Sequence, residues 1–95
     1  MQMLLIICRE SLEHKVVELL EDSGVKGYTI IEKLRGAGKT GVVPSEWSSP
    51  NSLVMVTAPN PQAESVINML KEFSRREAGH DIPLKLITWA CDVVI

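Results

Sequence analysis

The chain has 95 residues, of which 45% are hydrophobic and 23% charged, and its formal net charge is −2. This length predicts a single domain over residues 1–95, and a domain of this size buries only about 60–65% of its unfolded surface, so it gains stability from association. The slightly acidic balance argues against a nucleic-acid-binding module, which usually carries a concentrated basic face. The longest apolar run, residues 3–8, is too short to predict a membrane span.

The first half of the chain alternates between strand and helix patterns. Residues 3–8 form a continuous apolar run, typical of a strand buried on both faces. Ser11 is the predicted N-cap of a helix that ends at Gly24. The helical spacing is carried by Leu12, Val16, Leu19 and Leu20. Residues 26–35 are rich in Tyr, Thr and Ile, which predicts a second strand.

The second half repeats this order after a loop. Residues 36–51 are rich in Gly, Pro and Ser and predict the loop, and residues 53–58 predict a third strand. Asn60 as N-cap, with Pro61 at the first helical position, predicts a second helix. The apolar face of that helix comprises Ala63, Val66, Ile67, Leu70 and Phe73, and Gly79 ends it.

Residues 84–95 predict a long last strand with one strongly apolar face, made of Ile87, Trp89, Cys91, Val93 and Ile95. The complete order, β-α-β-β-α-β, predicts an α+β, ferredoxin-like fold: a four-stranded antiparallel sheet with two helices on one face. The other face of the sheet then has no helix to cover it, although its residues are apolar. A large exposed apolar face is unusual on a monomer, so we expect a homotrimer that encloses it.

A glycine-rich loop, Gly36-Ala37-Gly38-Lys39-Thr40, follows the second strand. Backbone amides freed by glycine, together with the lysine, suit a phosphate or carboxylate. The sequence is not a P-loop, because that pattern requires glycine where this chain has Lys33. A loop without chemistry of its own is the alternative interpretation.

Three more basic residues, Arg75, Arg76 and Lys85, flank the connection between the second helix and the last strand. With Lys39 they predict an anion site where the second strand of one subunit meets the last strand of another; ordinary surface charge is the alternative. Trp47 lies in a polar part of the loop, where it either anchors a partner or packs back onto its own chain.

Metal binding and catalysis find little support. His14 and His80 have no second His or Cys at ligand spacing, so no metal site is predicted. No triad, carboxylate pair or nucleophile elbow can be assembled, so no catalytic residue is assigned and an enzyme is not expected. Cys8 and Cys91 lie in apolar runs and are expected to be buried, reduced thiols, which predicts a cytoplasmic setting.

The chain resembles the P-II nitrogen-regulatory signalling proteins. The resemblance rests on Gly24-Val25-x-Gly27-Tyr28-Thr29, on Gly36-Ala37-Gly38 with Gly41, on Pro59 and on the order of elements. It implies a compact homotrimer that binds adenine nucleotides, ATP or ADP, between subunits and contacts a target protein, a transporter or an enzyme, through the loop at residues 41–51. The residues that it implies for the nucleotide cleft are Thr29, Gly36, Ala37, Gly38, Lys39, Thr40 and Lys85.

The chain also departs from that pattern. Its loop is shorter than usual and lacks the tyrosine that some members modify. The second phosphate-binding segment, Gly-Asp-Gly-Lys in the family, is here Ile82-Pro83-Leu84-Lys85, which keeps only the lysine. The arginines that usually follow the last strand in the family would come after Ile95, the last residue of this sequence. Each missing charged hydrogen bond removes about 1.5–3 kcal/mol of binding free energy. Two expectations therefore stay open: a small anionic effector that is not necessarily ATP, or no ligand.

Three hypotheses therefore stand. The first is a P-II-like, non-enzymatic regulator that binds a small anionic effector. The second is a trimeric metal-tolerance protein of the CutA type, which the sparse His and Cys disfavour. The third is an acylphosphatase-like hydrolase, for which Arg9 follows the first strand without the glycine loop that such an enzyme needs.

Overall fold

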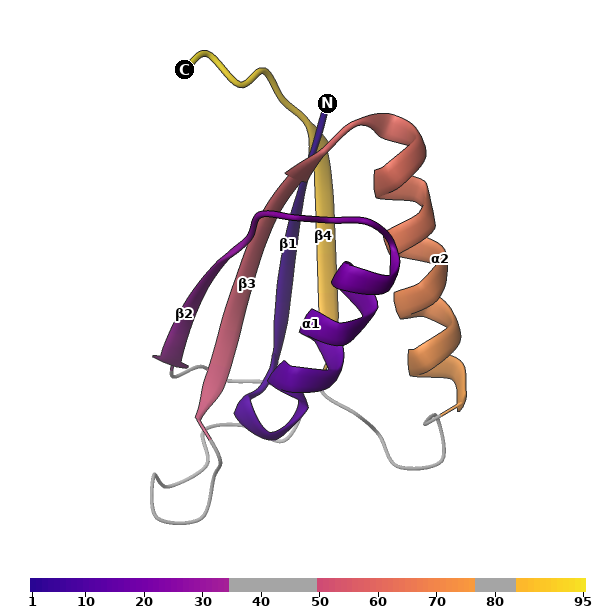
Figure 1. Ribbon diagram of the computed structural model, residues 1–95. Helices are drawn as coiled ribbons and strands as arrows, with labels where there is room; N and C mark the ends of the chain where they lie inside the picture. The colour runs from indigo at the N-terminus through magenta and orange to yellow at the C-terminus, as the bar shows by residue number, and fades with distance from the viewer. Residues whose placement is uncertain (35–49, 77–83) are drawn as a thin grey trace.

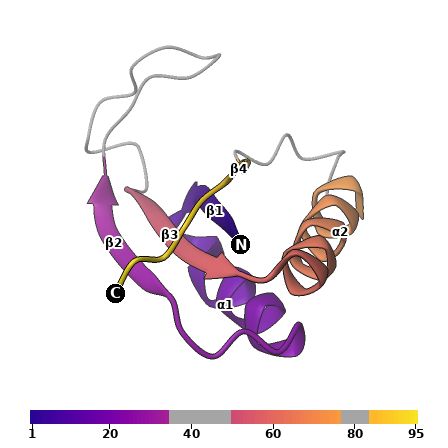
Figure 2. The same cartoon turned by 90° about the horizontal axis from the view of Figure 1, so that it is seen from above.

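The computed structural model describes residues 1–34, 50–76 and 84–95. The elements run in the order β1 (Gln2–Arg9), the short 3-10 turn η1 (Glu10–Leu12), α1 (Glu13–Asp22), β2 (Thr29–Leu34), β3 (Asn51–Ala58), α2 (Asn60–Arg76) and β4 (Lys85–Ala90). The strands form one antiparallel sheet in the order β2-β3-β1-β4. Both helices lie on one face of this sheet, which confirms the predicted ferredoxin-like fold (Figures 1 and 2).

The core lies between the helices and the sheet. Every second residue of β1, namely Leu4, Ile6 and Cys8, points into it and is fully buried. The alternate residues of β3 lie beside them because the two strands pair in register. The helices contribute buried residues at three- and four-residue spacing, which places them on one side of each helix: Val16 and Leu20 from α1, and Ala63, Val66 and Leu70 from α2.

The end of α1 is confirmed at Gly24, which adopts a positive φ of 85°. The Gly24 N–H donates to the carbonyl of Glu21 at 2.9 Å, and the Val25 N–H donates to that of Leu20 at 3.0 Å. This pair of bonds is the Schellman motif, in which glycine takes the left-handed conformation without strain. Val25 then turns into the core and starts the connection toward β2.

The predicted start of α1 is wrong. Ser11 is not an N-cap: it lies in η1, and α1 begins at Glu13 after Leu12, which makes no side-chain cap. The backbone is held differently, because the Glu10 N–H donates to the Pro50 carbonyl at 2.9 Å. The turn is thus fixed to the residue before β3, a long-range contact that no local capping signal reveals.

The second helix starts one residue earlier than predicted. The Ala63 N–H donates to the Pro59 carbonyl at 2.9 Å, so Pro59 rather than Asn60 receives the first helical hydrogen bond. The helix is continuous to Arg76. Its predicted end at Gly79 lies outside the described residues.

The predicted second strand is shortened at its start, since residues 26–28 precede β2. The strand also contains a bulge. Ile31 pairs with Leu53 and Leu34 pairs with Asn51, so three steps along β2 match two steps along β3. Lys33, inside the bulge, has a φ of 61°. The extra residue reverses the side-chain alternation, so that Ile31 and Leu34 share one face of the sheet.

The predicted last strand is too long. β4 ends at Ala90, not at Ile95, because β1, the strand that pairs with it in the described sheet, begins at Gln2 opposite Ala90. One further bond joins the Cys91 N–H to the Met1 carbonyl at 3.0 Å. Cys91 is only half-buried, which corrects the prediction that both thiols are buried, whereas Cys8 is buried as expected.

The face of the sheet away from the helices, called the open face below, is apolar. Its partly buried centre and more exposed margins comprise Met3, Leu5, Ile7, Ile31, Leu34, Leu53, Met55, Ile87 and Trp89. Ile31, Ile87 and Trp89 are 44%, 42% and 46% exposed. No described element covers this face (Figure 2).

Candidate functional site

The two predicted site residues that the structure describes are Thr29 and Lys85. Thr29 begins β2, Lys85 begins β4, and both side chains are exposed. The other five, residues 36–40, lie outside the described residues. The candidate site therefore comprises Thr29, Lys85 and the chain ends that flank the undescribed segments.

Those flanking chain ends gather at one end of the molecule. Figure 1 shows that β2 ends, β3 begins, α2 ends and β4 begins at the same end of the sheet. Antiparallel pairing produces this arrangement, because the connection from β2 to β3 and the connection from α2 to β4 must both turn there. The loop base and the start of β4 thus share one end of the fold, as the predicted site requires.

The sheet order nevertheless separates Thr29 from Lys85. β2 and β4 are its two edge strands, with β3 and β1 between them. Three inter-strand spacings of about 4.8 Å place the two edges about 14 Å apart. A single chain therefore does not bring Thr29 and Lys85 onto one small anion.

Both side chains do lie on the open face. Thr29 pairs with Met55, which pairs with Leu5, and Leu5 pairs with Ile87. Two residues closer to the loop end of the sheet, Lys85 pairs with Ile7 in the row that also contains Leu53 and Ile31. Directly paired residues in an antiparallel sheet project from the same face. The open face thus carries the Thr29 hydroxyl at its β2 margin and the Lys85 ammonium at its β4 margin. The apolar side chains of β3 and β1 lie between them.

Arg75 and Arg76, which the sequence grouped with Lys85, lie in the last turn of α2. Glu72 binds both: its Oε2 is 2.8 Å from the Arg75 Nη1, and its Oε1 is 3.7 Å from the Arg76 Nε. These exposed pairs satisfy part of the hydrogen-bonding capacity of the arginines. Lys85, in contrast, makes no ion pair with any residue in the parts of the chain that the structure describes.

The start of β3 is held by a buried polar contact that the sequence did not reveal. The Ser52 hydroxyl is fully buried and donates to the Glu13 Oε1 at 2.7 Å. Next to it, burial and, to a smaller extent, the Glu13 carboxylate raise the pKa of Cys8 to about 11. The raised pKa keeps the Cys8 thiol protonated at neutral pH, and the Ser52–Glu13 hydrogen bond joins the start of β3 to the first turn of α1.

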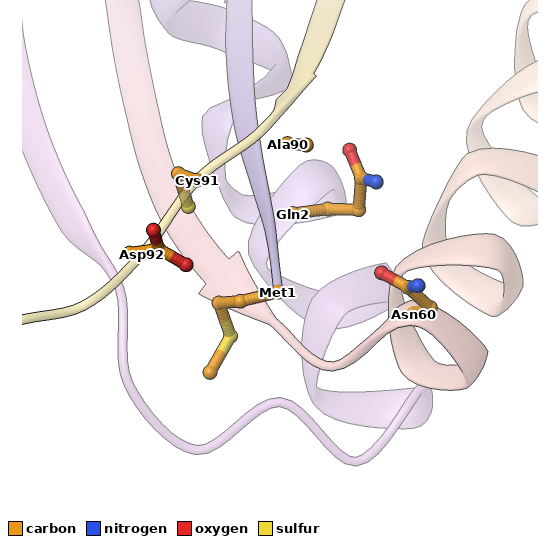
Figure 3. A pocket seen from close by; sticks show the side chains of 6 residues that line it. All are labelled: Met1, Gln2, Asn60, Ala90, Cys91 and Asp92. Carbon is orange, nitrogen blue, oxygen red and sulfur yellow. The ribbon is translucent and has the colours of Figure 1, made fainter.

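A pocket of ≈ 270 Å³ lies at the opposite end of the sheet, lined by Met1, Gln2, Asn60, Ala90, Cys91 and Asp92 (Figure 3). Figure 3 shows the Gln2 and Asn60 side chains on the side of α2, and Cys91 and Asp92 on the other side. This volume is below the about 300–1,000 Å³ of typical small-molecule sites. The pocket contains none of the predicted site residues.

Metal-binding and membrane-spanning features are absent from the described parts of the chain. Among residues 1–34, 50–76 and 84–95, no three His, Cys, Asp or Glu side chains are grouped so that they could hold a metal ion. His14 is exposed on α1, and His80 lies outside these ranges. None of the helices in these ranges is long and apolar enough to cross a membrane.

Solved structures of PII-like proteins share this fold. CPII, a nitrogen regulatory PII-like protein from Thiomonas intermedia K12 bound to ADP, AMP and bicarbonate, superposes with a TM-score of 0.70 at 22% identity, covering 93% of this chain and 84% of CPII. The apo form of CPII gives 0.63 at 23% identity, with 93% and 87% covered. A Thermus thermophilus protein assigned to the PII-like signalling proteins gives 0.63 at 18% identity, with 93% and 82% covered.

Sequence comparison gives the family directly. No curated protein matches the chain significantly. The profile of the family described as nitrogen regulatory protein P-II matches residues 1–88, which is nearly the whole chain. The match, the β-α-β-β-α-β order and the shared fold agree with the resemblance carried by residues 24–41, and the chain belongs to the P-II family of nitrogen regulatory proteins.

Proposed function

We propose that residues 1–95 form one P-II-like domain that acts as a non-enzymatic, cytoplasmic signal-transduction protein. The chain assembles as a homotrimer and binds a small anionic effector, an adenine nucleotide in the first instance, in the clefts between subunits. The effector changes the state of the loop at residues 41–51, which contacts a partner protein, a transporter or an enzyme. Order and disorder of a segment under the control of a ligand is a common switching mechanism.

The observation that carries this proposal is the position of Thr29 and Lys85 on opposite edges of one sheet. Each chain offers half of the predicted site at each edge, so the site is incomplete in a single chain. A second copy that places its β4 edge beside the β2 edge of the first supplies the missing half. The cleft and the oligomer are thus one proposal.

The open face supports the association of copies. Its apolar residues span all four strands, and a monomer rarely leaves so large an apolar surface in water. Cyclic symmetry with three copies closes the assembly and covers all three faces at once. A chain of this length gains stability from the area that is buried.

Lys85 is the described residue best suited to bind the effector. It is exposed, and no described carboxylate pairs with it. An ammonium group binds phosphate or carboxylate oxygens as a point charge, and the Thr29 hydroxyl and the amides of residues 36–38 would add neutral donors. The ADP and AMP bound to CPII support a nucleotide as the effector, and the bicarbonate supports a small anion beside it.

Two measurements on the purified chain test the proposal. Sedimentation velocity at micromolar concentration is expected to give a trimer. A thermal-shift screen with ATP, ADP, cyclic AMP, bicarbonate, 2-oxoglutarate and divalent metals is expected to show a nucleotide response, which calorimetry then measures as a Kd.

Lys85→Ala is expected to raise the Kd by about tenfold or more, because one charge-assisted contact is lost. Lys39→Ala is expected to act in the same direction. Lys71→Ala, an exposed lysine on the helix layer, is the matched control and is expected to leave the Kd unchanged. A stable single chain would contradict the proposal, and a response to metals alone would favour the CutA-type alternative.

A further inference from the structure

Two exposed cations are neighbours on the open face, at the end of the sheet where β1 ends and β4 begins. Arg9 is the last residue of β1, and Lys85 is the first residue of β4. Lys85 pairs directly with Ile7, and Arg9 lies two residues beyond Ile7 on the same face. Such diagonal neighbours in an antiparallel sheet are about 7–8 Å apart, a distance that long side chains span. The guanidinium and the ammonium can therefore bind one small group between them.

Asn51 adds a neutral donor on the other side of Arg9. It is the first residue of β3, pairs directly with Arg9 and is partly buried. Directly paired residues project from the same face, so the Asn51 amide lies beside Arg9 on the open face. The strands β3, β1 and β4 are consecutive in the sheet. A single chain therefore gathers an amide, a guanidinium and an ammonium, which it does not do for Thr29 and Lys85.

No described residue neutralises these two cations. Among the parts of the chain that the structure describes, no side-chain hydrogen bond or ion pair involves Arg9, Asn51 or Lys85. The apolar side chains of Ile7 and Leu53 lie next to the cations on the same face. Apolar surroundings weaken the screening of charge, so the two cations repel each other until an anion lies between them.

The donor groups select an oxyanion. A guanidinium presents its N–H groups in a fixed fork that binds two oxygens of a carboxylate, a bicarbonate or a phosphate at once. The Lys85 ammonium and the Asn51 amide supply further N–H donors. An anion with two or more oxygens can therefore accept hydrogen bonds from all three side chains.

We propose that Arg9, Asn51 and Lys85 form an oxyanion site at this end of the open face. The site takes either one phosphate group of a nucleotide or a free anion such as bicarbonate. It deepens the proposed function, on which it rests for the identity of the effector, by adding Arg9 and Asn51 to Lys85. The three residues occupy the rows of the open face nearest the loop, so the site stays at the rim when three copies cover the apolar rows.

Thermal unfolding in a low-salt buffer without oxyanions tests the site on the intact chain. Arg9→Gln and Lys85→Gln are each expected to raise the unfolding temperature by about 2 °C, because the repulsion is removed. Addition of inorganic phosphate or bicarbonate is expected to stabilise the unchanged chain and to have a much smaller effect on either variant. The variants are thus more stable than the unchanged chain without the anion and lose this advantage with it.

Calorimetry with ADP and adenosine then identifies the group that is bound. Each of the two variants is expected to raise the Kd of ADP by about tenfold and to leave the Kd of adenosine within about twofold. Arg9→Lys keeps the charge without the fork, so its effect on the Kd of ADP is expected to be smaller. Lys71→Gln, at an exposed position of α2, is the matched control and is expected to change neither Kd. Sedimentation velocity of each variant shows whether its assembly is unchanged.

The possible failures are distinguishable. If ADP binds both variants as tightly as it binds the unchanged chain, the oxyanion site is overturned and the proposed nucleotide effector stands. If phosphate or bicarbonate acts through Arg9 and Lys85 while no adenine nucleotide binds, the oxyanion site stands and the nucleotide effector fails. A chain that responds to none of these anions overturns both.

Discussion

The two faces of the sheet have nearly the same hydrophobicity but very different surroundings. On β1, Leu4 and Ile6 point toward the helices and are fully buried, whereas Leu5 and Ile7 point the other way and are only partly buried. β4 shows the same contrast, because Leu86 packs against the core whereas Trp89 on the open face is 46% exposed.

This difference shows that composition does not decide which residues form the core of one chain. The helix-facing residues are buried because α1 and α2 follow β1 and β3 and cross back over the same side of the sheet. Among the described elements, nothing gives the apolar residues of the open face such cover. At about 25 cal/mol per Å² of apolar surface removed from water, its burial by the proposed association would contribute a large free energy.

The sharpest test of the comparison uses two neighbouring leucines of β1. Leu4→Ala removes a fully buried side chain and is expected to lower the free energy of unfolding by about 2–5 kcal/mol. Leu5→Ala makes the same truncation on the open face. In the dissociated chain it is expected to cost less than about 1 kcal/mol, because the side chain is already partly in water.

Denaturant unfolding at low protein concentration measures both effects, and sedimentation measures association. Leu5→Ala is expected to weaken association, whereas Leu4→Ala acts mainly on the fold. Equal losses of folding stability from the two variants in the dissociated chain would remove the distinction between the faces.

Cys8 provides a pH test of the helix-covered face. Its thiol loses a proton near pH 9 when unfolded but keeps it to about pH 11 when folded, because burial raises its pKa. The stabilising contribution of the protonated thiol is therefore complete below pH 9 and is lost as the pH rises toward 11. At about 1.4 kcal/mol per pKa unit, a rise of about two units makes the loss on the order of 3 kcal/mol.

Unfolding measured from pH 8 to pH 11 checks this expectation. Cys8→Ala is expected to show a shallower decrease of stability over that range than the unchanged chain. Cys91→Ala, at the half-buried thiol, is the matched control and is expected to keep the steep decrease. Parallel curves for all three chains would show that burial of Cys8 has no such effect.

The smallest expected effect concerns the bulge in β2, which places the Leu34 side chain on the open face. Lys33 holds a φ of 61°, which strains any residue with a Cβ. Lys33→Gly is expected to stabilise the fold by about 0.5 kcal/mol, because relief of strain outweighs the greater freedom of glycine when unfolded. Lys26→Gly, before β2, lacks a positive φ and is expected to destabilise by a similar amount. Thermal unfolding of both variants shows whether their signs differ.

Most of the element order could be predicted because it is written in local patterns. The apolar run at residues 3–8, the helical spacing around Val16 and the turn at Gly24 each depend on neighbours within a few residues. The boundaries that failed depend on distant partners. Ser11 gave way to a turn bonded to Pro50, and β4 ended at Ala90 where β1 has no further residue to pair.

The candidate site was predictable only in its residue types. Glycines and lysines around residues 36–40 and at Lys85 predict anion binding from their chemistry. Which of them share a site is not a local property. The placement of Thr29 and Lys85 on opposite edges followed from the pairing of four strands.

By itself the sequence determined the kinds of elements, their order and the family, since periodicity, turn residues and motif spacing act over short distances along the chain. Only the tertiary structure decided which apolar face is covered, where Leu34 points and which edges carry Thr29 and Lys85. Those properties depend on strand register and on a single extra residue in β2, and contacts between residues far apart in the chain set both.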